Sequence, residues 1–194
     1  MRFSTVTSSI LLFFLLTACA TTNVSTYSID GKDTICHGNI NLGSIVILPE
    51  SAWRHDQKEP LKREQMALTE IKNAFKEVSC GTVRLPAGVK QFSKWSVISE
   101  AKIIEKFSSE GFDTIVIIRI EELTPRLNVS FSIPFLWSGS NEADFRVKVI
   151  SIKSGRVLND MRIKRATGGV FNIRPATWSK DELYAALLTI IKEN

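Results

Sequence analysis

Two uninterrupted apolar runs most constrain how this 194-residue chain can fold. The first is Ile-Val-Ile-Leu at residues 45–48, and the second is Ile-Val-Ile-Ile at residues 115–118. A strand with one face in water alternates apolar and polar residues, whereas a continuous run of this length is typical of a strand covered on both faces. The chain is therefore expected to build a sheet in which at least these two strands are fully buried.

Helical patterns separate these runs. The spacing of apolar residues predicts a helix from about Lys58 to Ser79, opened by a capping box of Asp56 and Glu59. A short strand at 83–85 follows, and a second helix is expected over 95–109, stopped by Gly111. The apolar face of this second helix is expected to comprise Ile98, Ala101, Ile104 and Phe107. Strands that alternate with helices in this way favour βαβ units and partly parallel pairing.

The second half of the chain alternates apolar and polar residues instead. This period predicts half-buried strands at 127–133 and 145–152, and Lys153 to Arg156 form a hairpin signal that leads to a partner strand over 157–165. Ser179 and Glu182 form a second capping box, which opens a terminal helix whose expected buried residues are Leu183, Leu187, Leu188 and Ile191. The predicted fold class is α/β (mixed α+β), with a single sheet of mixed parallel and antiparallel strands and about three helices.

The N-terminus has a separate character. Arg2 precedes an apolar run at 10–16, which is shorter than the roughly 20 residues that a membrane-spanning helix needs. The sequence Leu16-Thr17-Ala18-Cys19 then resembles the lipobox of bacterial lipoprotein precursors. This resemblance implies that residues 1–18 are a signal peptide and that Cys19 carries the lipid. An ordinary secretory signal with a chance cysteine, or an N-terminal transmembrane helix, is the alternative.

The residues after Cys19 bear on location. Residue +2 is Ala20 and not Asp, which by resemblance to enterobacterial sorting rules favours the periplasmic face of the outer membrane; the inner membrane and the cell surface stay open. Residues 20–35 are rich in Thr, Ser, Asn and Gly, so residues 19–35 are expected to be the lipid anchor and a flexible tether. Residues 36–194 are expected to form one globular domain.

Three cysteines are present. With Cys19 acylated, Cys36 and Cys80 remain as a pair in an oxidising compartment, which indicates a disulfide. Two free buried thiols, or a metal site formed by Cys36 and His37, are the alternatives. Only two histidines exist in the chain, so a metal is poorly supported.

Composition favours binding over catalysis. Removal of residues 1–18 takes away Arg2 and no acid, which lowers the net charge from +5 to +4. An exported protein seldom meets nucleic acid, so the mild positive charge points instead to anionic lipid or glycan as possible contacts. His37 and His55 lie far from any nucleophile motif such as Gly-x-Ser-x-Gly, so no catalytic site and no cofactor are expected.

Two segments are candidate contact surfaces. Phe135 and Trp137 stand in an apolar stretch, where exposed rings would contact a partner or a membrane, although they could equally cap the core. The second segment is basic, and strand alternation places two of its side chains on one face. Its residues are Arg162, Lys164, Arg165 and Arg174. This basic segment could meet an acidic partner or an anionic polymer, or simply be a solvated face.

The order of elements is similar to a known family. The chain opens its domain with Ile-Leu-Pro at 47–49, enters its next buried strand with Glu-Gly-Phe-Asp-Thr-Ile-Val-Ile at 110–117, and has the hairpin Val149 to Leu158. This pattern resembles the TolB N-terminal and CsgG-like envelope lipoprotein domains, over about residues 43–192. The resemblance implies a non-enzymatic accessory or assembly factor that acts through an envelope protein partner. A binding module for lipopolysaccharide or cell-wall glycan, using the basic segment, is the alternative.

The lipobox gives the first testable prediction. Cys19→Ser removes the only thiol that can accept the diacylglycerol at this site, so the variant is expected to lose all incorporation of labelled palmitate. Labelling of intact cells followed by immunoprecipitation measures this directly. Continued labelling of the variant would show that Cys19 is not the lipid attachment site.

Overall fold

The computed structural model describes residues 20–29, 34–37, 40–53, 55, 57–84, 92, 95–130, 136–170 and 176–191. Cys19 therefore lies outside the described residues. The strands are β1 (Thr21–Ser28), β2 (Ser44–Ser51), β3 (Thr82–Arg84), β4 (Thr114–Ser130), β5 (Leu136–Ser151) and β6 (Val157–Val170). The α-helices are α2 (Pro60–Ala74), α3 (Glu100–Ser109) and α4 (Ser179–Ile191), and the 3₁₀ turns are η1 (Phe75–Glu77), η2 (Trp95–Val97) and η3 (Ala176–Trp178).

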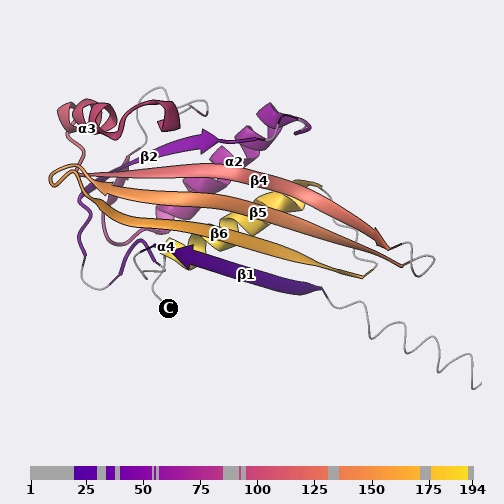
Figure 1. The fold of residues 1–194 in the computed structure, drawn as a ribbon. Helices are drawn as coiled ribbons and strands as arrows, with labels where there is room; N and C mark the ends of the chain where they lie inside the picture. The colour runs from indigo at the N-terminus through magenta and orange to yellow at the C-terminus, as the bar shows by residue number, and fades with distance from the viewer. Residues whose placement is uncertain are drawn as a thin grey trace, which may run out of the picture.

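The six strands form one open mixed sheet in the order β1-β6-β5-β4-β2-β3 (Figure 1). Strand β2 runs parallel to both β3 and β4, whereas β4–β5, β5–β6 and β1–β6 are antiparallel. The predicted fold class, with a single mixed sheet and about three helices, is confirmed. The predicted hairpin is also present, with Gly155 at φ 65° in the turn between β5 and β6.

Helices cover the two faces of the sheet unequally. Helices α2 and α4 pack on one face and bury the larger core, which takes Ile45 and Ile47 from β2 (Figure 1). Helix α3 and η2 pack on the other face, where Val46 and Leu48 meet Trp95, Ile103 and Phe107. Alternate residues of the run at 45–48 therefore pack into different cores, and all four residues are apolar for this reason.

The tether prediction is wrong for residues 21–28. They form β1, an edge strand that pairs with β6 along its whole length, from Thr21 opposite Gly168 to Ser28 opposite Met161. Both faces of β1 are largely exposed, so it carries no apolar period, and Thr and Ser side chains fit such a strand. The sheet therefore begins before residue 36, where the domain boundary was predicted.

Two local predictions also need correction. The strand expected at 127–133 is not separate, because β4 runs continuously for 17 residues to Ser130; Phe131 and Ile133 lie outside the described residues. Helix α3 buries Ile103 and Phe107. Of the other residues predicted to be buried, Ile104 is partly buried against the same core, whereas Ile98 and Ala101 are exposed. The reason is that the helix begins at Glu100, after the separate turn η2, so the period cannot be read continuously from Trp95.

The two helices begin at other positions than the predicted capping boxes imply. Helix α2 begins at Pro60, its N-cap is Glu59 in a left-handed conformation without a side-chain cap, and Asp56 lies outside the described residues. At the start of α4, Ser179 is already helical, and the carboxylate of Glu182 instead accepts hydrogen bonds from Arg165 and Thr167 of β6.

Cys36 and Cys80 form a disulfide, with their Cα atoms 5.5 Å apart. The disulfide prediction is confirmed, which removes the alternatives of two free thiols and of a metal site at Cys36. The bond joins the segment before β2 to the segment before β3. Among the helices of the described residues, none is long and apolar enough to cross a bilayer.

Candidate functional site on the open sheet face

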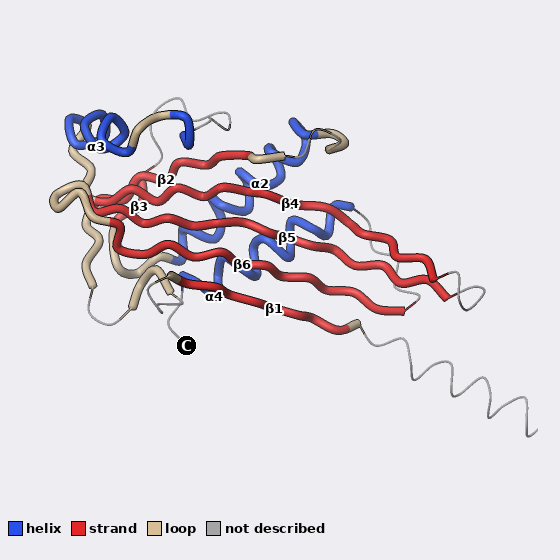
Figure 2. Tube along the Cα trace, in the orientation of Figure 1, coloured by secondary structure: helices blue, strands red, loops and turns tan. Residues whose placement is uncertain are grey.

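The face of the sheet that carries α3 is only partly covered. Figure 2 shows β4, β5 and β6 extending well past the end of α3, on the side opposite α2 and α4. There the alternate residues change from apolar to charged, and β5 and β6 contribute Asp144, Arg146, Asp160, Arg162 and Lys164. We call this charged part of the sheet the open face.

Ion pairs between neighbouring strands organise the open face. Arg146 donates two hydrogen bonds to Asp160, each 2.6 Å long, and Arg162 donates two to Asp144, each 3.0 Å long. A second carboxylate, that of Glu121, lies 2.6 Å from Arg162. The hydrogen bonds to Asp160 and to Asp144 raise the pKa of Arg146 and of Arg162, respectively. Such bidentate pairs fix the geometry of both side chains.

The predicted basic surface is therefore largely neutralised. Arg162 and Lys164 share one face, as alternation predicted, but Lys164 lies 2.7 Å from the Glu142 carboxylate and Arg162 has its two carboxylates. Arg165 points to the opposite face and pairs with Glu182 at 2.9 Å. Arg174 lies outside the described residues. The sequence showed these cations but not their acidic partners, which come from other strands and from α4.

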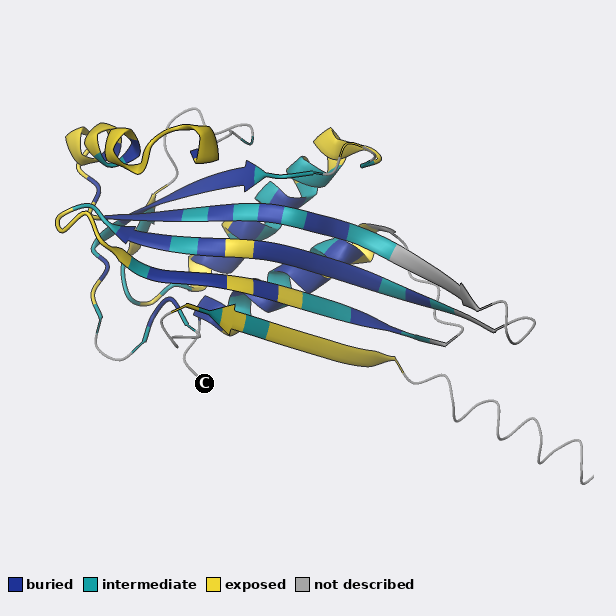
Figure 3. Ribbon diagram, viewed as in Figure 1, coloured by how far each residue is buried: buried dark blue, intermediate teal, exposed yellow. Residues whose placement is uncertain are grey.

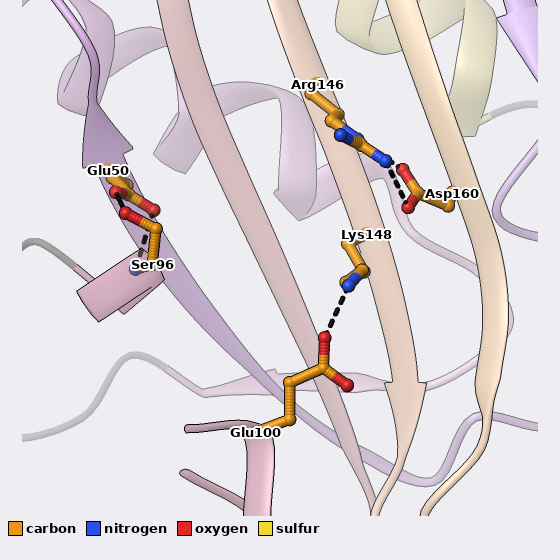
Figure 4. A network of polar contacts seen from close by, with 6 residues as sticks. All are labelled: Glu50, Ser96, Glu100, Arg146, Lys148 and Asp160. Carbon is orange, nitrogen blue, oxygen red and sulfur yellow. Dashed lines mark hydrogen bonds and ion pairs between the residues drawn. The ribbon is translucent and has the colours of Figure 1, made fainter. Parts of the chain in front are cut away.

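A cavity of about 230 Å³ lies where α3 and η2 meet the open face. Its polar wall includes Glu50 of β2, which accepts hydrogen bonds from the backbone N–H and the hydroxyl of Ser96 (Figure 4). Lys148 of β5 pairs there with Glu100 at the start of α3. Arg119 of β4 lines the same cavity. None of these residues has a signal in the sequence, because the cavity joins elements that are far apart in the chain.

The edge of the sheet next to the open face is formed by β1. Figure 3 shows this strand exposed over most of its length. Tyr27 and Ile29 are 72% and 61% exposed. With Arg146, Asp160 and other open-face residues they line a second cavity of about 250 Å³. The β1 edge and the open face are thus one continuous surface.

The predicted aromatic surface is placed only in part. Phe135 lies outside the described residues, and Trp137 belongs to β5, where its backbone is paired with Val129 of β4. Trp137 lies toward the end of the sheet at which β1 begins, because the register aligns Thr21 with Gly168, and Gly168 with Ser140 of β5. Among the described residues, no three His, Cys, Asp or Glu side chains converge to hold a metal.

No protein-family model matches the chain, and no curated protein sequence matches it. Its fold is similar to that of the PelC dodecamer from Paraburkholderia phytofirmans, with a TM-score of 0.50, 12% identity, and coverage of 90% of this chain and 100% of that chain. The lipoprotein GNA1162 from Neisseria meningitidis also matches, with a TM-score of 0.42, 13% identity, and coverage of 75% of this chain and 95% of that chain. The PelC likeness shows a shared fold. The resemblance to the TolB N-terminal and CsgG-like domains stays a prediction.

The ion pairs give a stability prediction. Asp160→Asn is expected to lower the free energy of unfolding by about 1–2 kcal/mol, because an amide cannot accept both N–H groups of Arg146 and presents a donor to one of them. Urea unfolding followed by circular dichroism measures the change.

The exposed pair Glu59–Lys62 at the start of α2 is the matched control, since its two side chains are 62% and 60% exposed. Glu59→Gln is expected to change the free energy of unfolding by less than about 0.5 kcal/mol. An Asp160→Asn protein as stable as the parent would show that the buried carboxylate contributes no net stability.

Proposed function

We propose that this chain is a lipid-anchored envelope protein that faces the periplasm and acts as a non-enzymatic accessory or assembly factor. The lipobox at 16–19 supports the anchor, and the disulfide supports export to an oxidising compartment. The PelC-like fold supports an assembly role, since that protein was solved as a dodecamer. The outer membrane is the proposed location, because Ala20 follows the lipidated cysteine.

The observation that carries this proposal is the position of β1. Its first residue, Thr21, comes two residues after Cys19, so their Cα atoms are at most about 7.6 Å apart. An acyl chain on Cys19 would therefore hold the start of the edge strand at the membrane surface. The lipid would confine the whole domain there and raise its effective concentration for a partner in the same membrane.

The outer edge of β1 is the proposed partner surface. An edge strand presents unpaired N–H and C=O groups, which can pair with an extended segment of another protein. Tyr27 of β1 and Ile29, directly after it, are exposed next to this edge on the side of the open face, and they add apolar contact area. The proposed partner is an envelope protein that adds a strand beside β1. Another copy of this chain is one such protein.

The glycan-binding alternative has weaker support. Binding of an anionic polymer needs cations without their own counter-ions. Arg162 and Lys164 each have carboxylates within 3.0 Å, and Arg165 pairs on the opposite face. This arrangement leaves little net positive charge on the described part of the predicted basic segment.

In-cell crosslinking of the tagged protein, followed by mass spectrometry, tests the partner surface. Tyr27→Ala combined with Ile29→Glu is expected to abolish the main crosslinked protein, because the change removes the apolar contacts and adds charge without touching the core. Leu61→Glu on α2 is the control, since Leu61 is 73% exposed and lies on the opposite side of the sheet.

The same crosslinked protein in the parent and in the Tyr27/Ile29 variant would contradict the β1 surface. If the Phe135→Ala/Trp137→Ala variant loses the crosslinked protein and the Tyr27/Ile29 variant keeps it, the partner surface is the aromatic stretch instead. Recovery of only lipid or glycan from the parent would overturn the accessory-factor proposal.

A further inference from the structure

Three arginines stand side by side across the sheet. The register places Arg119 of β4 opposite Arg146 of β5, and Arg146 opposite Arg162 of β6. Like charges directly opposite each other on neighbouring strands destabilise a sheet. Arg146 and Arg162 have carboxylate partners that offset this repulsion. Arg119 differs from both, because it forms no hydrogen bond or ion pair through its side chain with any residue that the structure describes.

The environment of Arg119 makes this difference important. Its Nε is buried and has no hydrogen-bond partner. Glu50 lies opposite Arg119 on β2, but both carboxylate oxygens of Glu50 accept hydrogen bonds from Ser96. Burial of a charge is unfavourable unless the charge is paired. A partly buried cation without an ion-pair partner is expected at a site that binds an anion.

Arg119 lines the cavity of about 230 Å³ beneath η2 and α3. Most other charged residues of the wall form ion pairs: Lys148 with Glu100, Arg146 with Asp160, and Glu121 with Arg162. Glu50 is hydrogen-bonded to the neutral side chain of Ser96. One wall is apolar and consists of Trp95, Ile98, Ile103 and Ile117. Trp95 is 8% exposed, and its indole N–H also lacks an acceptor. The cavity therefore combines one unpaired cation with an apolar surface.

We propose that this cavity binds a carboxylate group, with the guanidinium of Arg119 as its anchor. A guanidinium donates two parallel hydrogen bonds to a carboxylate. A monoanion fits better than a phosphate dianion, because the carboxylates of Glu50 and Glu121 line the same wall. A short apolar group next to the ligand carboxylate would contact Ile98, Ile103 and Ile117. The carboxylate could belong to a small organic acid or to the carboxyl terminus of a peptide.

Titration of the mature, acylated protein in detergent micelles tests this site. The probes are isovalerate for a free acid and N-acetylglycylleucine for a peptide terminus, and isovaleramide and N-acetylglycylleucinamide are their uncharged controls. The ¹⁵N resonance of the Trp95 indole reports binding. At least one acid is expected to shift it saturably, whereas its amide does not, and whichever acid binds identifies the source of the carboxylate.

The variants compare Arg119 with an arginine outside the cavity. Arg119→Gln is expected to weaken binding of the acid at least about tenfold, and Arg119→Lys is expected to weaken it less, because lysine keeps the charge but not the two-pronged geometry. Arg156→Gln, in the exposed hairpin turn, is expected to leave binding unchanged. Equal binding by Arg119→Gln, equal binding of acid and amide, or no binding of either acid up to about 50 mM would each overturn the proposal.

Thermal unfolding without ligand provides a second readout. Removal of an unpaired, partly buried cation is expected to raise the unfolding midpoint of Arg119→Gln by about 2–4 °C. A higher midpoint also shows that any loss of binding does not come from misfolding. A lower midpoint would show that Arg119 stabilises the folded chain, and would contradict its assignment as an unpaired binding group.

Discussion

The parallel pairing of β2 with β4 is the constraint on which the rest of the structure depends. Both strands are buried on two faces at this pairing, so the sheet needs a layer on each side of it. Helices α2 and α4 supply one layer, and α3 with η2 supplies the other. Because α3 has only ten residues, its layer covers one end of the sheet and leaves β5 and β6 facing outward. The open face is a consequence of this unequal cover.

Charged residues stabilise the open face without a helix above it. Asp144 and Asp160 are nearly buried there, and each accepts two hydrogen bonds from an arginine on the neighbouring strand. Isolated surface ion pairs contribute little, but bidentate pairs between partly buried groups are stronger and define the positions of both side chains. Arg119 is the exception in this regular pattern. It lies where the charged network meets the α3 layer, and it lines the cavity at that boundary.

The sequence predicts correctly those elements that depend on local features of the chain. The apolar runs at 45–48 and 115–118, the hairpin at Gly155 and the helix stop at Gly111 are confirmed, since each depends on burial or on a positive φ at one place. Strand β1 was not predicted, because an edge strand with two exposed faces has no apolar period. The acidic partners of Arg162 and Lys164 were not predicted because they come from other strands, and only the register brings them together. The cavity at Arg119 combines residues of five elements and has no signal in any one segment of sequence.

The link between anchor and sheet is central to the proposed function. If β1 begins two residues after a lipidated Cys19, the domain is held at the membrane by an edge strand and not by a tether. Hydrogen exchange of the mature, acylated protein in vesicles, resolved at residues 21–28, tests this most directly. Slow exchange of the amides that β1 donates to β6 is the predicted result. Exchange of all amides in this segment at the rate of an unstructured peptide would show that the segment is a flexible tether.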